Sequence, residues 1–254
     1  MLSFARRLWS EAEAAPASVP QGMRVYAVGD VHGRLDLLDQ LLGQIARDAE
    51  QAPDLMKYLV FLGDYIDRGP QSAHVIERLA TGLPPVFGTV FLRGNHEETM
   101  LAFLTDITAG PGWLTYGGDA TLASYGLPAP APDAPPEHLL EAQRLLNAAL
   151  PPHHRSFLGG LRSHLTIGDY HFVHAGIRPG VPLDRQDDGD RLWIRNEFLS
   201  SRTNHGKMVV HGHTIAPEPE QRANRIGIDT GAYTTNRLTA LVLEGTQRRF
   251  LCTV

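Results

Sequence analysis

The stretch MRVYAVGDVHGRLDLLDQLLGQIA, residues 23–46, indicates the fold of the first half of the chain. The β-forming run Met23–Val28 leads through a polar turn into Leu35–Ala49, where apolar residues recur at helical spacing. The same order then follows twice, with strands expected at Lys57–Leu62 and Val86–Leu92 and helices expected at Ser72–Ala80 and Glu97–Leu104. Strands that alternate with helices predict parallel βαβ units.

The second half of the chain is expected to be rich in strands. Before it, Gly110–Gly118 and the proline-rich Pro128–Pro136 are expected to form loops, and Glu137–Leu150 has a helical pattern. Further strands are expected at His164–Ile167, Tyr170–Val173, Met208–Val210, Arg225–Ile228, Leu238–Leu243 and Arg248–Cys252. The pattern therefore predicts an α/β protein in which two sheets pack together with helices outside them.

Composition narrows the class of protein. The 254 residues are 43% hydrophobic and 20% charged, and the formal net charge of -5 argues against a surface that coats nucleic acid. The single cysteine, Cys252, excludes a disulfide framework within the chain and indicates a cytoplasmic protein. No apolar run approaches the roughly 18 residues of a membrane helix, so no membrane partner is expected. We expect an N-terminal arm, as a short helix or frayed segment, at residues 1–22 and one domain at residues 23–254.

Five short polar motifs each follow an apolar, strand-like run. They are GDVHGR (Gly29–Arg34), GDYIDRG (Gly63–Gly69), RGNHE (Arg93–Glu97), VHAG (Val173–Gly176) and HGHT (His211–Thr214). In α/β proteins, ligands collect at the carboxyl ends of strands, so polar loops in this position can converge on one site.

The motifs contain side chains that commonly bind metals. Residues two apart at the end of a strand point the same way, so Asp30 and His32 could face one cation, although Asp30 could instead cap the following helix. Later motifs add further ligand types at Asp64, Asn95, His96, His174 and His213. Oxygen and imidazole ligands without thiolate favour Mn, Fe or Zn over Ca or a structural zinc. A carboxylate among them could bridge two ions.

Taken in order, GD-x-HG, GD-x-x-DRG, GNHE, HAG and GHT resemble the signature motifs of the phosphoprotein phosphatases, within the calcineurin-like metallophosphoesterases. The matched stretch runs from about Met23 to Tyr233 and includes IDTGAY at Ile228–Tyr233. The resemblance implies the calcineurin-like fold, an αββα four-layer sandwich. It also implies two divalent metal ions, with Mn favoured and Fe or Zn as alternatives.

The resemblance also assigns roles by position. It places Asp30 and His32 on the first metal, Asp64 between the metals, and Asn95, His174 and His213 on the second metal. His211 lies outside the GHT match and is expected to be structural. Many members of the wider superfamily have another histidine two residues after the GHT histidine, whereas this chain has Ile215, as in the phosphatase branch.

Four further residues are assigned to catalysis and phosphate binding. The resemblance makes His96 the proton donor to the leaving oxygen, oriented by Asp67, and a nearby carboxylate does stabilise an imidazolium near neutral pH. Asp67 could alternatively pair with Arg68 in the turn. Arg68 resembles the family's phosphate-binding arginine, and Arg195, in LWIRNEF, resembles the second, although a surface salt bridge is the alternative for Arg195.

The substrate is the least determined feature of the sequence. Phosphorylated proteins with phosphoserine or phosphothreonine, and in some relatives phosphotyrosine, are favoured over dinucleoside polyphosphates such as diadenosine tetraphosphate. Both substrate classes fit the same motifs. An inactive phosphate-recognising module is a third alternative, but such a module would not need the pair of His96 and Asp67. The oligomeric state is left open.

Overall fold

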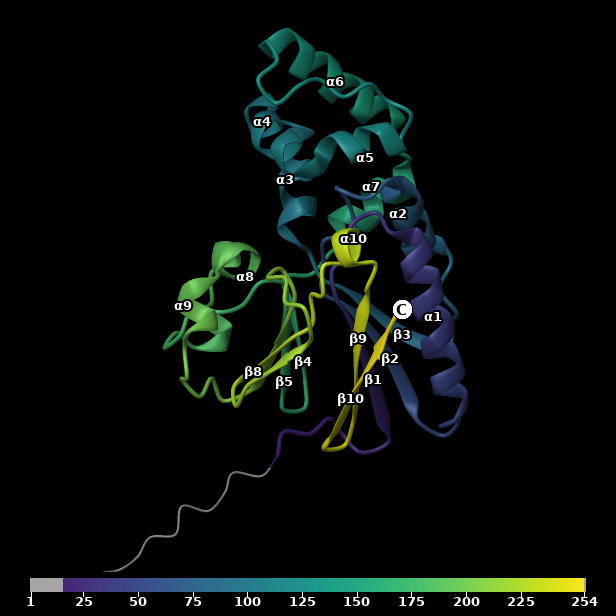
Figure 1. Ribbon diagram of the computed structural model, residues 1–254, viewed down its shortest axis with the longest axis vertical. Coiled ribbons are helices and arrows are strands. Elements are labelled where there is room, and N and C mark those ends of the chain that lie inside the picture. The colour runs from purple at the N-terminus through teal and green to yellow at the C-terminus, as the bar shows by residue number, and fades with distance from the viewer. Residues whose placement is uncertain (1–15, 254) are drawn as a thin grey trace, which may run out of the picture.

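Two five-stranded sheets form the centre of the molecule (Figure 1). The computed structural model describes residues 16–253. The first sheet contains, in spatial order, β10 (Gln247–Cys252), β9 (Thr239–Glu244), β1 (Met23–Val28), β2 (Met56–Phe61) and β3 (Phe87–Phe91). β1, β2 and β3 are parallel, whereas β9 is antiparallel to β1. The last strands of the chain therefore complete the sheet that the first strands begin.

The second sheet is also mixed. It contains β4 (His164–Ile167), β5 (Tyr170–Val173), β6 (Met208–His211), β8 (Arg225–Gly227) and β7 (Glu220–Gln221), in spatial order. β5, β6 and β8 are parallel, and an antiparallel strand lies at each edge. The expected strands are present close to their expected bounds, and the two-residue strand β7 is an addition.

Helices cover the sheets and rise above one end of the first. The longer ones are α1 (Leu35–Glu50), α2 (Ser72–Thr81), α3 (Asn95–Phe103), α6 (Pro136–Ala149) and α7 (Pro152–Gly159). The shorter ones are η1 (Ile107–Ala109), α4 (Gly110–Trp113), η2 (Leu114–Gly118), α5 (Asp119–Ser124), η3 (Leu183–Arg185), α8 (Asp188–Trp193), α9 (Asn196–Leu199) and α10 (Ala232–Thr235). Among the described residues, no helix is both long and apolar enough to cross a membrane.

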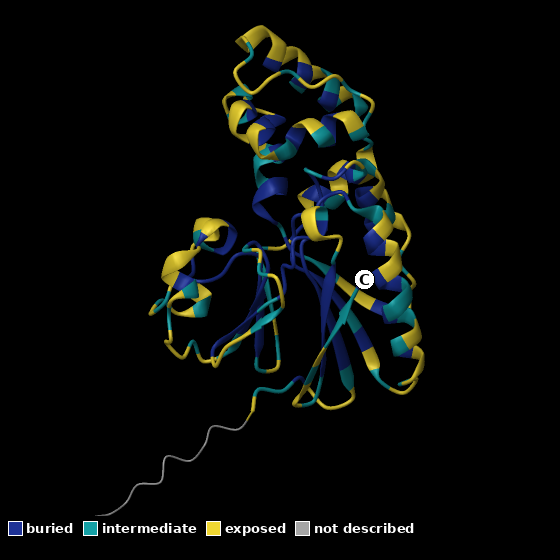
Figure 2. Ribbon diagram, in the orientation of Figure 1, coloured by how far each residue is buried: buried dark blue, intermediate teal, exposed yellow. Residues whose placement is uncertain are grey.

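Three hydrophobic clusters separate four layers. Along β1, Tyr26 and Val28 pack against the helices, whereas Val25 and Ala27 face the second sheet, because successive side chains of a strand point to opposite faces. A third cluster lies between the second sheet and the segment of α8 and α9. The buried residues concentrate at these interfaces (Figure 2). The predicted αββα arrangement is confirmed.

One predicted loop is wrong. Gly110–Gly118 is helical, since it forms α4 followed by a wide helical turn, η2. Trp113 is buried there against Phe103, with ring centroids 5.1 Å apart, and this packing outweighs the low helix propensity of glycine. The proline-rich segment forms no regular element until Pro136, the first residue of α6.

The described part of the N-terminal arm lies across both sheets. The backbone N–H of Val19 donates to the Gly245 carbonyl in the turn between β9 and β10, at 3.0 Å. The neighbouring Ser18 donates to the Asp169 carboxylate between β4 and β5. Residues 16–22 form no helix or strand, and the rest of the expected arm, residues 1–15, lies outside the described residues.

Candidate metal centre

The five motif loops follow β1, β2, β3, β5 and β6, and their side chains of metal-ligand type lie together. Asp64 is at the centre of this group, because its Oδ2 lies 3.6 Å from His32 Nε2 and 3.4 Å from His174 Nε2. His174 Nε2 also lies 2.9 Å from Asn95 Oδ1. Asp30 joins the group through the backbone N–H of His213, which donates to Asp30 Oδ2 at 2.9 Å.

Two histidines are oriented in the same way. His32 Nδ1 lies 2.9 Å from the Ile66 carbonyl, and His174 Nδ1 lies 2.9 Å from the Leu62 carbonyl. A carbonyl can only accept, so each Nδ1 carries the hydrogen and each Nε2 keeps its lone pair facing Asp64. Histidines that bind metals are held in this manner, with the second nitrogen donating to a backbone or carboxylate oxygen.

Buried atoms without partners also indicate a cation. Asp30 Oδ1 and His213 Nε2 are buried and have no hydrogen-bond partner among the described residues. Burial raises the pKa of Asp30 well above its ordinary value, and the nearby carboxylates of Asp229 and Asp64 raise it further. Crowded carboxylates that lack donors are stabilised by a positive ion. The residues present therefore fit divalent metal ions.

Local backbone conformation places these side chains. Positive φ angles are uncommon outside glycine and cost free energy, and they concentrate at functional sites. Among the described residues they occur at His32 (46°), Asp64 (52°), Asp67 (71°), Arg68 (69°), His213 (64°) and Asn236 (60°). All but the last belong to the candidate site.

Two motif glycines leave room for the carboxylates. A side chain at Gly94 would collide with Asp64 Oδ1, and one at Gly212 would collide with Asp30 Oδ1. The glycines of GNHE and HGHT are therefore required because a carboxylate packs directly against their backbone.

Glu97, the last residue of GNHE, supports the loop of Asp64. Its buried carboxylate accepts from the backbone N–H groups of Asp64 at 2.9 Å and Tyr65 at 2.8 Å. The Glu97 carboxylate also accepts, at 3.0 Å, from the backbone N–H of Gly94, the residue just before α3. From the sequence alone, Glu97 is assigned no role. Its place as the last residue of the motif RGNHE is the only sign in the sequence that it supports the site.

His96 and Asp67 form a buried pair beside the candidate metal ligands. His96 Nδ1 lies 2.6 Å from Asp67 Oδ2. Burial lowers the pKa of His96, but the carboxylates of Asp64 and Asp67 outweigh it, and the pKa lies above its ordinary value. Asp67 also accepts from Trp113 Nε1 at 3.0 Å and Thr121 Oγ1 at 2.6 Å. Sequence reasoning missed both donors, because nothing local links α4 and α5 to this loop.

Arg68 lies at the opening of the site. Its Nη2 is 3.2 Å from His96 Nε2, and its guanidinium lies over the Tyr233 ring, 4.6 Å from the centroid. Its backbone N–H donates to the Gly117 carbonyl at 3.2 Å, where the positive φ of 107° favours glycine. The helical turn η2 thus touches the loop of Arg68.

Arg195, between α8 and α9, contacts the loop that carries His213. Its Nη1 lies 3.2 Å from Thr214 Oγ1 and 3.4 Å from the His213 carbonyl. The structure therefore brings all ten sequence-predicted site residues to one place. His211 is buried in β6 beside the Phe198 ring, and His211 Nδ1 lies 3.1 Å from the Gly212 carbonyl.

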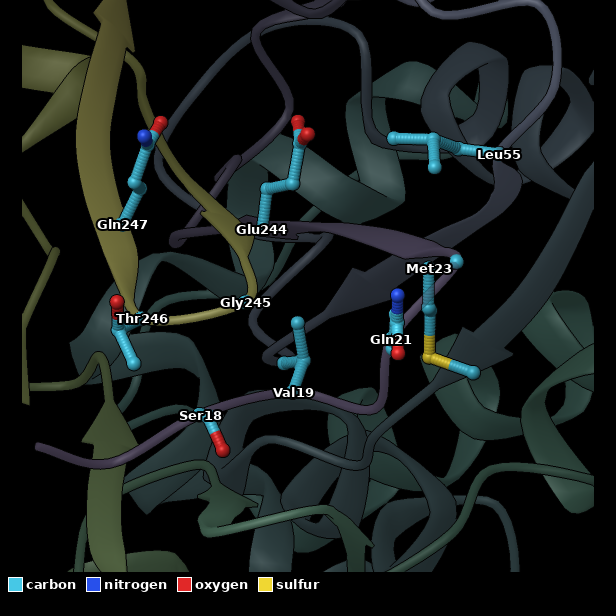
Figure 3. Close-up of a pocket in the computed structure, with 10 residues that line it drawn as sticks. Ser18, Val19, Gln21, Met23, Leu55, Glu244, Gly245, Thr246 and Gln247 are labelled. Carbon is cyan, nitrogen blue, oxygen red and sulfur yellow. The ribbon is translucent and has the colours of Figure 1, made fainter. Parts of the chain in front are cut away.

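One hollow lies beside the candidate site, and another lies far from it. A small one beside His96 is lined by Asn95, His96, Thr99, Trp113, Tyr116 and Trp193. Tyr116 and Trp193 are 59% and 46% exposed, although large apolar side chains are usually buried. The other hollow, shown in Figure 3, lies at the opposite end of β1, between Gln21, Leu55 and Glu244. It contains none of the motif residues.

Known proteins share this arrangement. Residues 23–240 match the model of the calcineurin-like phosphoesterase family. The asymmetrical bis(5'-nucleosyl)-tetraphosphatase PrpE of Oceanobacillus iheyensis is 26% identical over 86% of this chain and 88% of its own length. Serine/threonine-protein phosphatase 2 of Escherichia coli is 28% identical over 85% of this chain and 90% of its own length.

A solved structure supports the fold in the same way. A cold-active protein tyrosine phosphatase superposes with a TM-score of 0.61 at 19% identity, over 92% of this chain and 80% of its own. The family match covers β1 to β8 and every motif loop. The chain belongs to the calcineurin-like phosphoesterase family and is a metal-dependent phosphoesterase.

Proposed function

We propose that two divalent ions bind at this centre and are shared by one carboxylate. Asp30 and His32 would hold the first ion, Asn95, His174 and His213 the second, and Asp64 both. The observation that carries this proposal is the position of Asp64 Oδ2 between His32 Nε2 at 3.6 Å and His174 Nε2 at 3.4 Å. Two buried groups of side chains here could hold an ion, His32, Asp64 and His96 in one and Asp64, His174 and His213 in the other, and Asp64 belongs to both.

Manganese is the ion we propose, with iron or zinc as alternatives, because the ligands are oxygen and imidazole atoms without thiolate. Bound ions would lower the pKa of a water between them and neutralise charge on the phosphoryl oxygens. The chain has its only cysteine, Cys252, on β10, far along the sequence from every motif. A covalent cysteinyl intermediate is therefore not part of the proposed reaction.

The remaining site residues would bind the phosphoryl group and donate a proton to the leaving oxygen. Arg68, with support from Arg195, would bind phosphoryl oxygens through paired N–H groups. Arg68 Nη2 lies 3.2 Å from His96 Nε2, so a phosphoryl group bound there would lie beside the imidazole. His96, held by Asp67 through Nδ1, would donate its proton to the leaving oxygen.

We propose a phosphorylated protein as the substrate, carrying phosphoserine or phosphothreonine and also phosphotyrosine, so that the leaving group is the side-chain oxygen of the residue. A similar relative is named as a serine/threonine-protein phosphatase. The site lies at loops on the carboxyl edges of both sheets, with Arg68 in the loop after β2 and Arg195 between α8 and α9. An extended peptide can reach such an opening.

A second candidate is asymmetrical cleavage of a dinucleoside tetraphosphate. The relative named as a bis(5'-nucleosyl)-tetraphosphatase is comparably similar. The hollow beside His96 favours this candidate, because the exposed rings of Tyr116 and Trp193 could contact a nucleobase. A phosphotyrosine ring could use the same surface.

Turnover of matched substrates tests the proposed function. With saturating Mn, kcat/KM should be measured for phosphoserine, phosphothreonine and phosphotyrosine peptides and for diadenosine tetraphosphate. We expect the peptides to be preferred and all activity to disappear with chelator. A preference for diadenosine tetraphosphate that Trp193→Ala reduces would support the second candidate instead. Absence of metal-dependent turnover on every substrate would contradict both.

A further inference from the structure

A second group of metal-ligand side chains lies outside the active site. Glu77 is on α2, whose first residue, Ser72, accepts a hydrogen bond from the backbone N–H of Asp67. Five residues along a helix correspond to about 7.5 Å, so Glu77 lies well beyond that contact. His153 and His154 are in the first turn of α7, which packs beside α2 (Figure 1). Neither histidine belongs to a sequence motif.

The three side chains converge on one point. Glu77 Oε2 lies 2.7 Å from His153 Nε2 and 2.9 Å from His154 Nε2. The three ligand atoms all lie within 4.8 Å of one another. Ligand atoms around a tetrahedral zinc are about 3.3 Å apart for bonds of roughly 2.0–2.1 Å. If each histidine nitrogen moved about half an ångström farther from the carboxylate oxygen, an ion would fit between the three side chains.

Neighbouring hydroxyl groups hold two of the ligands in place. His154 is buried, and its Nδ1 lies 2.8 Å from the Tyr125 hydroxyl. If Nδ1 donates to this hydroxyl, Nε2 keeps a lone pair for a metal, which is the usual arrangement around metal-bound histidine. Thr81 Oγ1 donates to the Glu77 backbone carbonyl at 2.8 Å and also lies 3.1 Å from Glu77 Oε1, whereas Glu77 Oε2 faces the histidines.

Exposure at this site suits an ion that keeps a water ligand. The side chains of Glu77 and His153 are 50% and 49% exposed, so an ion can enter from solvent. Burial lowers the pKa of His154, which favours the neutral imidazole that a metal needs. Two imidazoles and one carboxylate are also the ligand types that bind zinc well.

We propose that Glu77, His153 and His154 bind one divalent ion of the zinc class, with water completing its coordination. The site joins α2, which covers the first sheet, to α7, which ends the helical region that begins at α3. A bound ion would therefore fasten that region to the sheet. It would stabilise the fold and take no part in phosphoester hydrolysis, so the proposal is independent of the proposed function.

Zinc counting tests the proposal. Protein purified with saturating Mn would be equilibrated with micromolar zinc, desalted and analysed for metals. We expect His153→Ala and Glu77→Ala to bind about one zinc ion per chain less than the wild type, because each loses a ligand. His138→Ala is the matched control, since this exposed histidine on α6 contacts none of the three residues and should leave the count unchanged.

Two further readouts make the outcome decisive. The increase in Tm on adding zinc should be smaller in His153→Ala and Glu77→Ala than in the wild type and in His138→Ala. Mn-dependent turnover of p-nitrophenyl phosphate should be unchanged in all three variants. A zinc count in either His153→Ala or Glu77→Ala equal to that of the wild type would overturn the proposal and leave an ordinary hydrogen-bonded cluster.

Discussion

At the scale of single residues, the centre combines strained backbone with tight carboxylate packing. Asp64 and Asp67 both have positive φ angles, and such positions cost about 1–3 kcal/mol each. Glu97 offsets part of this cost, since its carboxylate accepts from the N–H groups of the Asp64 loop. The consequence is a fixed geometry in which Asp64 faces the histidines and Asp67 faces His96.

The proposed role of His96 as a proton donor gives the first prediction. His96→Asn should retain metal and lower turnover of phosphoserine peptides by about 10²–10⁴-fold, because the leaving alkoxide then lacks its proton donor. The loss should be smaller for p-nitrophenyl phosphate, whose leaving group is stable as an anion. Steady-state kinetics on both substrates, with metal analysis of the same preparation, measures this.

The alternative role for His96 is as a metal ligand, because its Nε2 lies 3.9 Å from Asp64 Oδ2. In that case His96→Asn would lose metal, and turnover would fall equally on both substrates. A uniform loss with reduced metal content would move His96 from catalysis to metal binding.

At the scale of elements, the helices α4 and α5 act on the active site from outside the motifs. Trp113 at the end of α4 and Thr121 in α5 both donate to Asp67. The turn η2 between them accepts from the backbone of Arg68 through Gly117. Orientation of the proposed catalytic pair therefore depends on a helical segment outside the motifs.

Removing one of these hydrogen bonds gives the second prediction. Trp113→Phe keeps an aromatic ring against Phe103 but removes the N–H that donates to Asp67. We expect kcat on phosphoserine peptides to fall about 10–100-fold, as when other supporting partners of a site are removed. KM and metal content should change little, and these are measured together with kcat.

A positioning role has a signature that lost packing lacks. If Trp113 acts through Asp67 and His96, the loss in Trp113→Phe should be smaller on p-nitrophenyl phosphate, as in His96→Asn. Thr121→Val, which removes the other donor, should show the same dependence on the leaving group. Equal losses on both substrates, accompanied by a lower Tm, would mean that Trp113 only supports the fold.

At the scale of the whole molecule, the sequence predicts the parts that depend on local pattern. The order of strand, motif and helix along Met23–Phe103 follows from periodicity, and the motifs themselves lie at strand ends. Pairing of β9 with β1 joins residues that are over two hundred positions apart, and no local pattern shows it. The helical conformation around Trp113 is likewise not shown by the local pattern, because it depends on packing against Phe103 and on the hydrogen bond to Asp67.

The candidate site also has features that local sequence predicts and features that it does not. Its ligand types and their order could be predicted from short motifs. Asp229 beside Asp30, the donors to Asp67 and the stacking of Tyr233 on Arg68 depend on segments that meet only in the folded chain. A sequence can show which side chains bind or react, whereas the groups that orient them are set by tertiary contacts.

The proposed metal ligands come from both sheets, so metal binding and stability of the whole molecule should be linked. Asp30 and Asp64 follow strands of the first sheet, whereas His174 and His213 follow strands of the second. Chelation should leave buried carboxylates without a cation and weaken the contact between the sheets. At a free metal concentration of a hundred times Kd, each bound ion raises the free energy of unfolding by about 2.7 kcal/mol. This corresponds to a rise in Tm of roughly 5–10 °C for a domain of this size.

The last prediction is therefore that Mn raises Tm by an amount that follows its binding stoichiometry. Metal analysis should give about two Mn per chain at saturation, as expected for a centre in which one carboxylate joins two ions. Asp64→Asn should lower the number of Mn ions bound per chain and should remove most of the rise in Tm. His138→Ala should change neither. Manganese suits this measurement because the site at Glu77 should prefer zinc over it. One Mn per chain with full activity would contradict the shared role of Asp64.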